Sequence, residues 1–197
     1  ADNTIQIGTM FGYLKEEDYK VSITNRIFET YLYDLFYLNE TKNSRLADAA
    51  AVERNQFISG HYLDMDKVLE RFQAHYTSYY GEKDWEFLEE DGRFLFLTFL
   101  KPIINGTGHY YVDAGTRDQR RTDIIVDYHG KQYIIELKIW HGEEYQAKGR
   151  KQLCDYLDSY EQNKGWLVSF CFNKAKEKKT GIKKINEAGK IITEVVV

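Results

Sequence analysis

The sequence predicts an α/β domain, in which helices pack on a sheet, preceded by an all-helical segment. Three observations predict this class. Residues 1–83 carry apolar side chains at helical spacing, whereas residues 109–140 fall into short strand-like runs separated by turn residues. An amphipathic helical pattern and a nearly continuous apolar run of strand length then follow. Helices alternating with strands are typical of layered α/β domains.

Length and composition limit the possible classes of protein. A chain of 197 residues fits one domain, or one domain with a smaller appendage. The net charge of -4 lacks the basic excess that is typical of nucleic-acid-binding domains, although a local basic patch is compatible with it. No run approaches the roughly 20 apolar residues of a membrane-spanning helix, so we expect no membrane association.

The chain also lacks the features of a secreted protein. It begins Ala-Asp-Asn-Thr, without the basic and apolar regions of a signal peptide. Its two cysteines, Cys154 and Cys171, have no metal-ligand spacing, so we expect buried free thiols in a reducing compartment. A cytoplasmic protein is therefore expected. Because the first residue is not Met, we also expect a piece of a longer chain.

Three helices are expected in the first region, residues 1–83. Thr24 is a suitable N-cap for the first helix. The apolar positions of that helix follow an i, i+3/i+4, i+7 pattern and are Ile27, Phe28, Tyr31, Leu32, Leu35 and Phe36. The second helix covers Leu46 to Phe57, and the third runs from about Asp66 to Tyr80.

The second region, residues 84–197, begins with a helix that is apolar on nearly every side. Asp84 is its expected N-cap, and the helix runs towards Lys101. A helix without a polar face is normally buried, so this one is expected at the centre of the domain. The segment Asn-Gly-Thr-Gly at residues 105–108 ends it.

Strands and one further helix are expected in the rest of this region. Aromatic and β-branched runs mark the strands, and a stripe of apolar residues marks the helix. The expected elements are strands from His109 to Ala114, Thr122 to Tyr128 and Gln132 to Trp140, a helix from about Glu143 to Tyr160, a strand from Trp166 to Phe172, and a last strand from Ile191 to Val197. The Lys-rich segment 174–190 is expected to be a solvated loop, and contact with a nucleic-acid backbone stays open as an alternative.

The second and third strands of this set are expected to form a hairpin with charges at unusual positions. A two-residue turn at residues 129–130 fixes the pairing. The first pairs are Tyr128 with Lys131 and Val126 with Tyr133. The same register places Asp123 opposite Glu136 and Arg121 opposite Lys138. Like charges so placed destabilise a sheet, so the two carboxylates require a compensating cation.

The neighbours of these carboxylates favour a metal ion as that cation. Ile125 and Ile134 lie on the same face, which is therefore at least partly buried, and unpaired carboxylates are costly there. Two carboxylates with water and phosphate oxygens are a usual Mg²⁺ site. Lys138 shares the face of Glu136, because side chains two apart in a strand point the same way. A solvated face with alternating Glu and Lys remains the alternative.

This order of motifs resembles the PD-(D/E)XK nuclease superfamily. The residues that carry the resemblance are an Asp at one strand, Glu136-x-Lys138 on the next, and Gln152 and Tyr156 on the following helix, similar to the Gln-x-x-x-Tyr element of the RecB-like branch. Arg121-x-Asp123 is similar to the start of the metal strand, although Arg120 stands where Gly is usual. The resemblance covers roughly residues 84 to 172. It implies a restriction-endonuclease-like core of helix, three antiparallel strands, helix and strand.

The resemblance also implies roles for individual residues. Asp123 and Glu136 would bind Mg²⁺, with Mn²⁺ as a possible substitute, and Lys138 would be the catalytic lysine. An additional acid from the first core helix is expected; Glu90 is our first choice and Glu89 the next, while Glu86 and Asp91 stay open by spacing. Gln152 and Tyr156 would position the lysine or touch substrate, unless Tyr156 only belongs to the apolar stripe. Phosphate contacts are expected from three arginines, Arg117, Arg120 and Arg121.

More narrowly, the chain resembles the C-terminal part of bacterial proteins that join an AAA-type ATPase-like domain to a PD-(D/E)XK domain. Residues 10–13 and 21–28 are similar to the helical connector of those proteins. No Gly-x-x-x-x-Gly-Lys-Ser/Thr loop occurs here, so the ATPase half is expected elsewhere in a longer chain and as a partner.

The expected function is therefore Mg²⁺-dependent hydrolysis of phosphodiester bonds, most simply in DNA, by an endonuclease or exonuclease. One alternative is a catalytically inactive module of the same fold that binds nucleic acid or a protein partner. Another is a helical adaptor whose first eighty residues mediate assembly. DNA versus RNA, strandedness and oligomeric state are left open by the sequence.

Overall fold

The computed structural model describes most of the chain, in two compact units of residues 1–42 and 43–197. Described are residues 3–17, 20–25, 28, 35, 44–80, 89–115, 121–172 and 180–197, without the side chains of residues 17, 20, 90, 113–115, 121 and 122. Each unit is treated by itself.

The first unit contains a helix and a β-hairpin. Helix α1 (Asn3–Met10) is followed by strands β1 (Leu14–Glu17) and β2 (Lys20–Ile23), which pair antiparallel. The expectation of an all-helical region is therefore wrong here. Thr24, expected as a helix cap, instead closes the hairpin, because its backbone N–H donates to the Tyr13 carbonyl at 3.0 Å. Nearly all of the helix expected after Thr24 lies outside the described residues.

The second unit contains four described helices and eight strands. The helices are α3 (Arg45–Glu53), with a short 3-10 turn η2 (Arg54–Gln56) after it, α4 (Met65–Tyr80), α5 (Glu89–Ile104) and α6 (Glu143–Ser159). The strands are β3 (Ile58–Ser59), β4 (Tyr62–Leu63), β5 (Gly108–Gly115), β6 (Arg121–Tyr128), β7 (Lys131–Ile139), β8 (Lys164–Phe170), β9 (Gly181–Glu187) and β10 (Lys190–Val196). The short pair β3–β4 also falls in the region expected to be all helical.

Six strands form one mixed sheet in the order β5-β6-β7-β8-β10-β9. Strands β5, β6 and β7 are antiparallel neighbours, β7, β8 and β10 are parallel, and β9 pairs antiparallel with β10. The order α5, β5, β6, β7, α6, β8 along the chain is the order expected from the sequence. The mixed α/β class is thereby confirmed.

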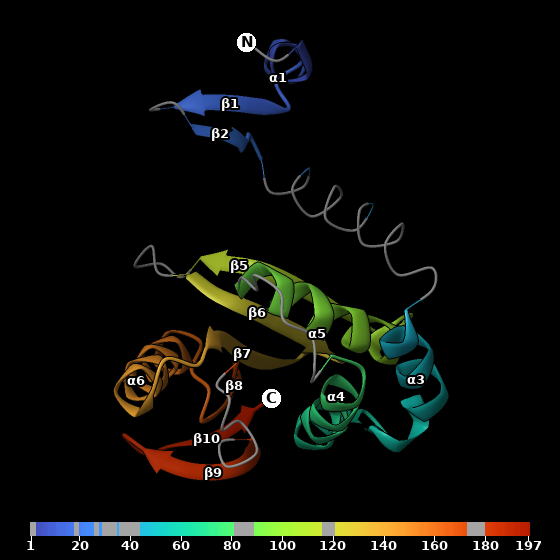
Figure 1. The fold of residues 1–197 in the computed structure, drawn as a ribbon, viewed down its shortest axis with the longest axis vertical. Coiled ribbons are helices and arrows are strands. Elements are labelled where there is room, and N and C mark those ends of the chain that lie inside the picture. Colours follow the sequence, from blue (N-terminus) through green and yellow to red (C-terminus); the bar gives the residue numbers. More distant parts are fainter. Residues whose placement is uncertain are drawn as a thin grey trace. The chain divides into compact units, whose positions relative to one another are not determined.

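The two faces of the sheet are covered by different helices (Figure 1). On one face, apolar residues of α6 pack on the sheet in a cluster of Ile134, Leu153, Cys154, Tyr156, Leu157, Leu167 and Ile192. On the other, Phe170 of β8 meets the rings of Phe72 and Tyr76 from α4. Gly92 lets α5 approach that same ring, because a Cβ there would lie 2.3 Å from the Phe170 ring. As expected, α5 is central, with Phe96, Leu97 and Phe99 fully buried.

One partly buried acid ties α4 to the sheet. The Asp66 carboxylate accepts hydrogen bonds from the Trp166 indole N–H at 2.7 Å and the Thr193 hydroxyl at 3.1 Å. The ammonium groups of Lys164 and Lys184 lie 2.9 and 2.8 Å from its Oδ2. These bonds outweigh burial, which alone would raise the pKa of Asp66, and hold that pKa below its usual range.

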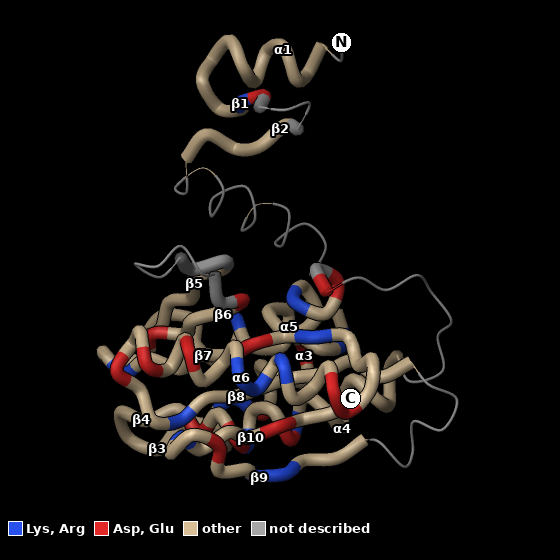
Figure 2. The backbone as a smooth tube through the Cα atoms, turned by 90° about the vertical axis from the view of Figure 1, so that its left-hand side faces the viewer, with Lys and Arg blue, Asp and Glu red and all other residues tan. Residues whose placement is uncertain are grey.

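Strand β9 lies where the sequence indicated a solvated loop. Its side chains are mostly exposed, and its sequence Gly-Ile-Lys-Lys-Ile-Asn-Glu has no period-two apolar pattern that would predict a buried face. Charges of both signs are interspersed along the described backbone (Figure 2), without a continuous basic stretch in this view. Among the described helices, none is both long and apolar enough to cross a membrane.

Candidate functional site

The β6–β7 hairpin has the register expected from its turn. Tyr128 pairs with Lys131 and Val126 with Tyr133. His129 and Gly130 both have positive φ, 51° and 74°, as a two-residue turn of this hand requires. The register expected for the hairpin is therefore confirmed along the described ladder.

At the open end of the hairpin, Asp123 takes part in the strand pairing through its side chain. The described ladder ends at the pair Ile124 and Ile135. The next contact is a hydrogen bond of 2.8 Å from the Leu137 backbone N–H to Oδ2 of Asp123. This bond holds the Asp123 carboxylate against β7, the strand that carries Glu136.

Glu136 and Lys138 form an ion pair on the same face of β7. The Lys138 Nζ lies 2.9 Å from Oε1 of Glu136, whose side chain is only 1% exposed. Both oxygens are buried, and neither meets the geometry of a hydrogen bond with a described residue, so Oε2 has neither a hydrogen bond nor an ion pair there. Buried polar atoms are normally hydrogen-bonded, so an acceptor left in this state indicates that something else belongs beside it.

Burial and mutual proximity shift the pKa values of all three groups. Burial raises the pKa of Asp123, against the opposing effects of the Leu137 N–H, Lys138 and Arg93. Burial and the nearby Asp123 charge raise the pKa of Glu136 to about 8. Burial alone would lower the pKa of Lys138, but the two carboxylates outweigh it and raise that pKa instead. The lysine therefore stays charged, while the carboxylates resist carrying two full charges together.

Helix α5 brings a cation to the site that the sequence patterns did not indicate. Nη2 of Arg93 lies 3.7 Å from Oδ1 of Asp123, and both side chains are largely buried. An Arg within a strongly apolar helix is the signal that could have suggested a buried partner. The same helix contains Glu89, whose charge acts on Asp123 and Lys138.

The structure leaves the remaining expected residues partly undetermined. Glu90 lies in α5 and Arg121 in β6, but their side chains are not described. Arg117, Arg120 and Glu86 lie outside the described residues. Asp91 is described in α5, next in the chain to the two glutamates considered for the site.

Helix α6 places Gln152 and Tyr156 beside the carboxylates. The Gln152 amide donates to the Tyr156 hydroxyl at 2.8 Å. Burial raises the pKa of Tyr156, and the charges of Glu136, Asp123 and Lys138 also act on it. Tyr156 belongs to the α6 core cluster, as its place in the apolar stripe indicated, while a role in positioning Lys138 or touching substrate stays a prediction.

A buried polar pair next to Lys138 has no counterpart in the sequence patterns. Ser169 of β8 is the register partner of Lys138, and its hydroxyl donates to Oε1 of Gln146 at 2.8 Å. Both side chains are essentially unexposed. They continue the polar surroundings of Lys138 onto β8 and α6.

The donor set fits a small, hard divalent cation. Asp123 and Glu136 supply carboxylate oxygens, and those of Glu136 accept no hydrogen bond from a described residue. Mg²⁺ is usually bound through one or two carboxylates with water. Among the described side chains, no group of three or more His, Cys, Asp or Glu gathers closely enough to hold a metal. Two carboxylates with a charged Lys138 suit chemistry at a phosphoryl centre, where negative charge must be stabilised.

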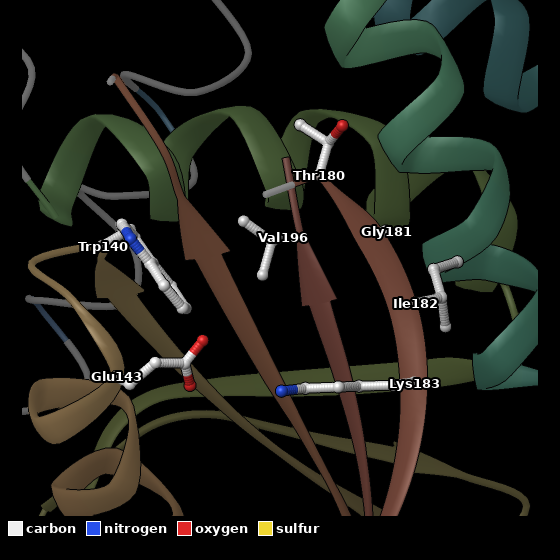
Figure 3. Close-up of a pocket in the computed structure, with 7 residues that line it drawn as sticks. All are labelled: Trp140, Glu143, Thr180, Gly181, Ile182, Lys183 and Val196. Carbon is white, nitrogen blue, oxygen red and sulfur yellow. The ribbon is translucent and has the colours of Figure 1, made fainter. Parts of the chain in front are cut away.

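A separate pocket of about 300 Å³ lies near β9, on the same face of the sheet as the carboxylates (Figure 3). Its lining residues are Trp140, Glu143, Thr180, Gly181, Ile182, Lys183 and Val196. Lys183 also pairs with the buried Glu194 at 2.9 Å. None of these lining residues is Asp123, Glu136 or Lys138, so the pocket is distinct from the pair of carboxylates.

Comparison of the chain with protein-family models, with curated proteins and with solved structures gave no match.

Proposed function

We propose that the chain hydrolyses phosphodiester bonds of nucleic acid, DNA in the first instance, in a Mg²⁺-dependent reaction of the PD-(D/E)XK type. One observation carries the proposal: two buried carboxylates stand at the open end of one hairpin, with an ammonium 2.9 Å from one of them. The order of the core elements and the Gln152–Tyr156 hydrogen bond on α6 support it.

In this proposal, each residue has a defined task. Asp123 and Glu136 hold the divalent cation, which, when bound, supplies activation of water and stabilisation of phosphoryl charge. Lys138 keeps its proton and orients water or offsets charge that develops on the phosphate. Arg93 limits the repulsion between the carboxylates by lying beside Asp123. Gln152 and Tyr156 hold the wall of the site on the side of α6.

Cleavage of plasmid and linear DNA with Mg²⁺ or Mn²⁺ tests the proposal. Asp123→Ala and Lys138→Ala are expected to lose activity by about a hundred-fold or more, since the first removes a ligand of the cation and the second removes the positive charge that offsets charge on the phosphate. Asp158→Ala is the matched control, because it breaks an ion pair of 2.8 Å with Lys190 at the far end of α6. Equal activity of the three variants would contradict the assignment.

Cation binding tests the same site without relying on activity. Titration calorimetry with Mn²⁺ is expected to show binding that Glu136→Gln weakens at least ten-fold and Asp158→Ala leaves unchanged. Binding of DNA without Mn²⁺ binding or cleavage would favour the inactive nucleic-acid-binding module. The inactive module is the second candidate because the described side chains include no group of three or more metal-binding residues at the site.

A further inference from the structure

An exposed aromatic ring stands at the first turn of α6. Tyr145 is 38% exposed. The His141 ring, just before the helix, meets it edge to face, with ring centroids 5.1 Å apart and planes at 88°. One face of the tyrosine ring is thus held in a defined orientation on a rigid element, while much of its surface stays open to solvent.

Helical spacing places this ring on the side of α6 that borders the carboxylates. Tyr145, Gly149, Gln152 and Tyr156 are separated by four, three and four residues, so they form one stripe along the helix. A Cβ at Gly149 would lie 3.5 Å from the Leu167 side chain of β8 and 3.6 Å from Cγ of Lys138, so the stripe packs over β8 and β7 at the level of the lysine. The charges of Glu136, Asp123 and Lys138 act on Tyr156, further along the same stripe.

Along that stripe, Tyr145 lies one turn before Gly149, the residue that faces Lys138. Only residues 140–142 separate β7 from α6, and the two elements contact each other, so the helix runs back over the strand. Four residues of helix advance about 6 Å, and helical side chains lean towards the N-terminus. The Tyr145 ring therefore lies beyond Lys138, towards the C-terminal end of β7.

A single exposed aromatic side chain is ordinary on a protein surface. Tyr145 differs in two respects, because His141 orients it and its helical stripe borders the candidate site. Aromatic side chains beside a groove that binds the nucleic-acid backbone commonly stack with unpaired bases, because every base has a π-face.

We propose that Tyr145 is a stacking platform for an unpaired base of the strand bound at Asp123 and Glu136. The ligand class is single-stranded nucleic acid, or a duplex opened near the cleaved bond. This inference rests on the proposed function and deepens it, since it names strandedness as a property of the substrate. Tyr145 binds substrate here and takes no part in the bond-breaking step.

The probe is a fluorescein-labelled single strand of twelve deoxynucleotides, titrated with the full chain and followed by anisotropy. Tyr145→Ala is expected to weaken binding about ten-fold, because base–aromatic stacking contributes on this scale. Tyr145→Phe keeps the ring and is expected to bind as the unaltered chain does. Tyr62→Ala is the matched control, since Tyr62 is 63% exposed near the turn end of β7.

An abasic scan of the same strand locates the contact. Removing one base, at the position that meets Tyr145, is expected to weaken binding to the unaltered chain and to leave binding to Tyr145→Ala unchanged. In cleavage assays Tyr145→Ala raises KM and leaves kcat within about two-fold. A merely structural role of Tyr145 predicts instead an equal loss with every strand, and that result would overturn the proposal.

The outcomes separate this inference from the proposed function. If the chain cleaves DNA and Tyr145→Ala behaves as Tyr62→Ala does, the stacking role is wrong and the nuclease stands. If only intact duplex is bound and cut, the stacking role is again wrong. If the chain binds single strands through Tyr145 without binding Mn²⁺ or cutting, the stacking role stands and the nuclease fails.

Discussion

At the residue scale, the Glu136 carboxyl group determines how the site responds to pH without a divalent cation. In the unfolded chain it titrates near its ordinary pKa of 4.5, and in the folded chain its pKa is raised to about 8. Between these values the folded state holds the additional proton. The stability that this proton contributes is complete below pH 4.5 and is lost as the pH rises through 8.

Glu136→Gln tests this linkage. At pH 5 both side chains are neutral and nearly isosteric, so the two proteins are expected to have similar free energies of unfolding. At pH 9 the variant is expected to be more stable by about 2 kcal/mol, because it has no proton to lose. Urea unfolding at both pH values measures the difference. Glu144→Gln, on the exposed part of α6, is the control and should change little at either pH.

Asp66 has the opposite sign of pH dependence. Its pKa is held below the ordinary 3.8, so the stability it contributes is complete above that value and is lost as the pH falls towards its folded pKa. Asp66→Ala is expected to lower the free energy of unfolding at pH 7 by about 2–3 kcal/mol, since the Trp166 indole N–H loses its acceptor.

Trp166→Phe separates the effect of the indole hydrogen bond from that of the ionised Asp66 carboxylate. It removes one donor and keeps Asp66 paired with its lysines. We expect a loss of about 1 kcal/mol for that change. A loss for Asp66→Ala that stays the same down to pH 2 would contradict the ionised role of the carboxylate.

At the scale of elements, two helical glycines differ in the reason that they matter: one allows close packing, and the other only lowers helix propensity. Ala at position 92 of α5 would place its Cβ 2.3 Å from the Phe170 ring, which is fully buried and packed against α4. Gly92→Ala is therefore expected to lower the free energy of unfolding by about 2 kcal/mol. At Gly149 of α6 the nearest atoms lie 3.5 Å away, an ordinary contact. Gly149→Ala is expected to stabilise by about 0.5–1 kcal/mol through helix propensity.

Chemical unfolding of the two variants under one condition measures this pair. Stabilisation by both changes would show that helix propensity outweighs the approach of α5 to Phe170.

The sequence was most informative where local rules are strict. The turn at residues 129–130 fixes the β6–β7 register, and apolar spacing correctly placed α4 and α6. It also placed the described part of α5, which runs on to Ile104, while Asp84, the expected N-cap, lies outside the described residues. It failed at β9, because an edge strand with exposed side chains has no buried face to reveal. It also failed at β1 and β2, where four-residue strands are too short for a clear period.

The candidate site shows the same division. Asp123, Glu136 and Lys138 were found because the strand period links them, and the structure brings all three together. Arg93 and the Gln146–Ser169 pair were missed, since they reach the site across packed elements that no spacing rule connects. The side chain of Glu90 is not described, so its role in the site stays a prediction.

At the scale of the whole molecule, residues 43–197 form a unit with its own core. A fragment of residues 43–197 is expected to unfold cooperatively, with a thermal midpoint within about 3 °C of the full chain and the same Mn²⁺ affinity. A fragment of residues 60–197 is the comparison, because it loses Leu46 and Ala50, which are fully buried. Calorimetry of the two fragments decides whether α3 belongs to the folding unit.

The place of β10 between β8 and β9 matters while the chain is being made. Protein synthesis proceeds from the N-terminus, so β8 leaves the ribosome before residues 190–196, its partner on that side. Until then the nascent chain carries an unpaired apolar edge from Gly165 to Phe170, which is buried in the finished fold. Such edges template association with other chains. A chain that ends before residue 190 would keep this edge of β8 unpaired, and chaperones would be expected to bind the protein there.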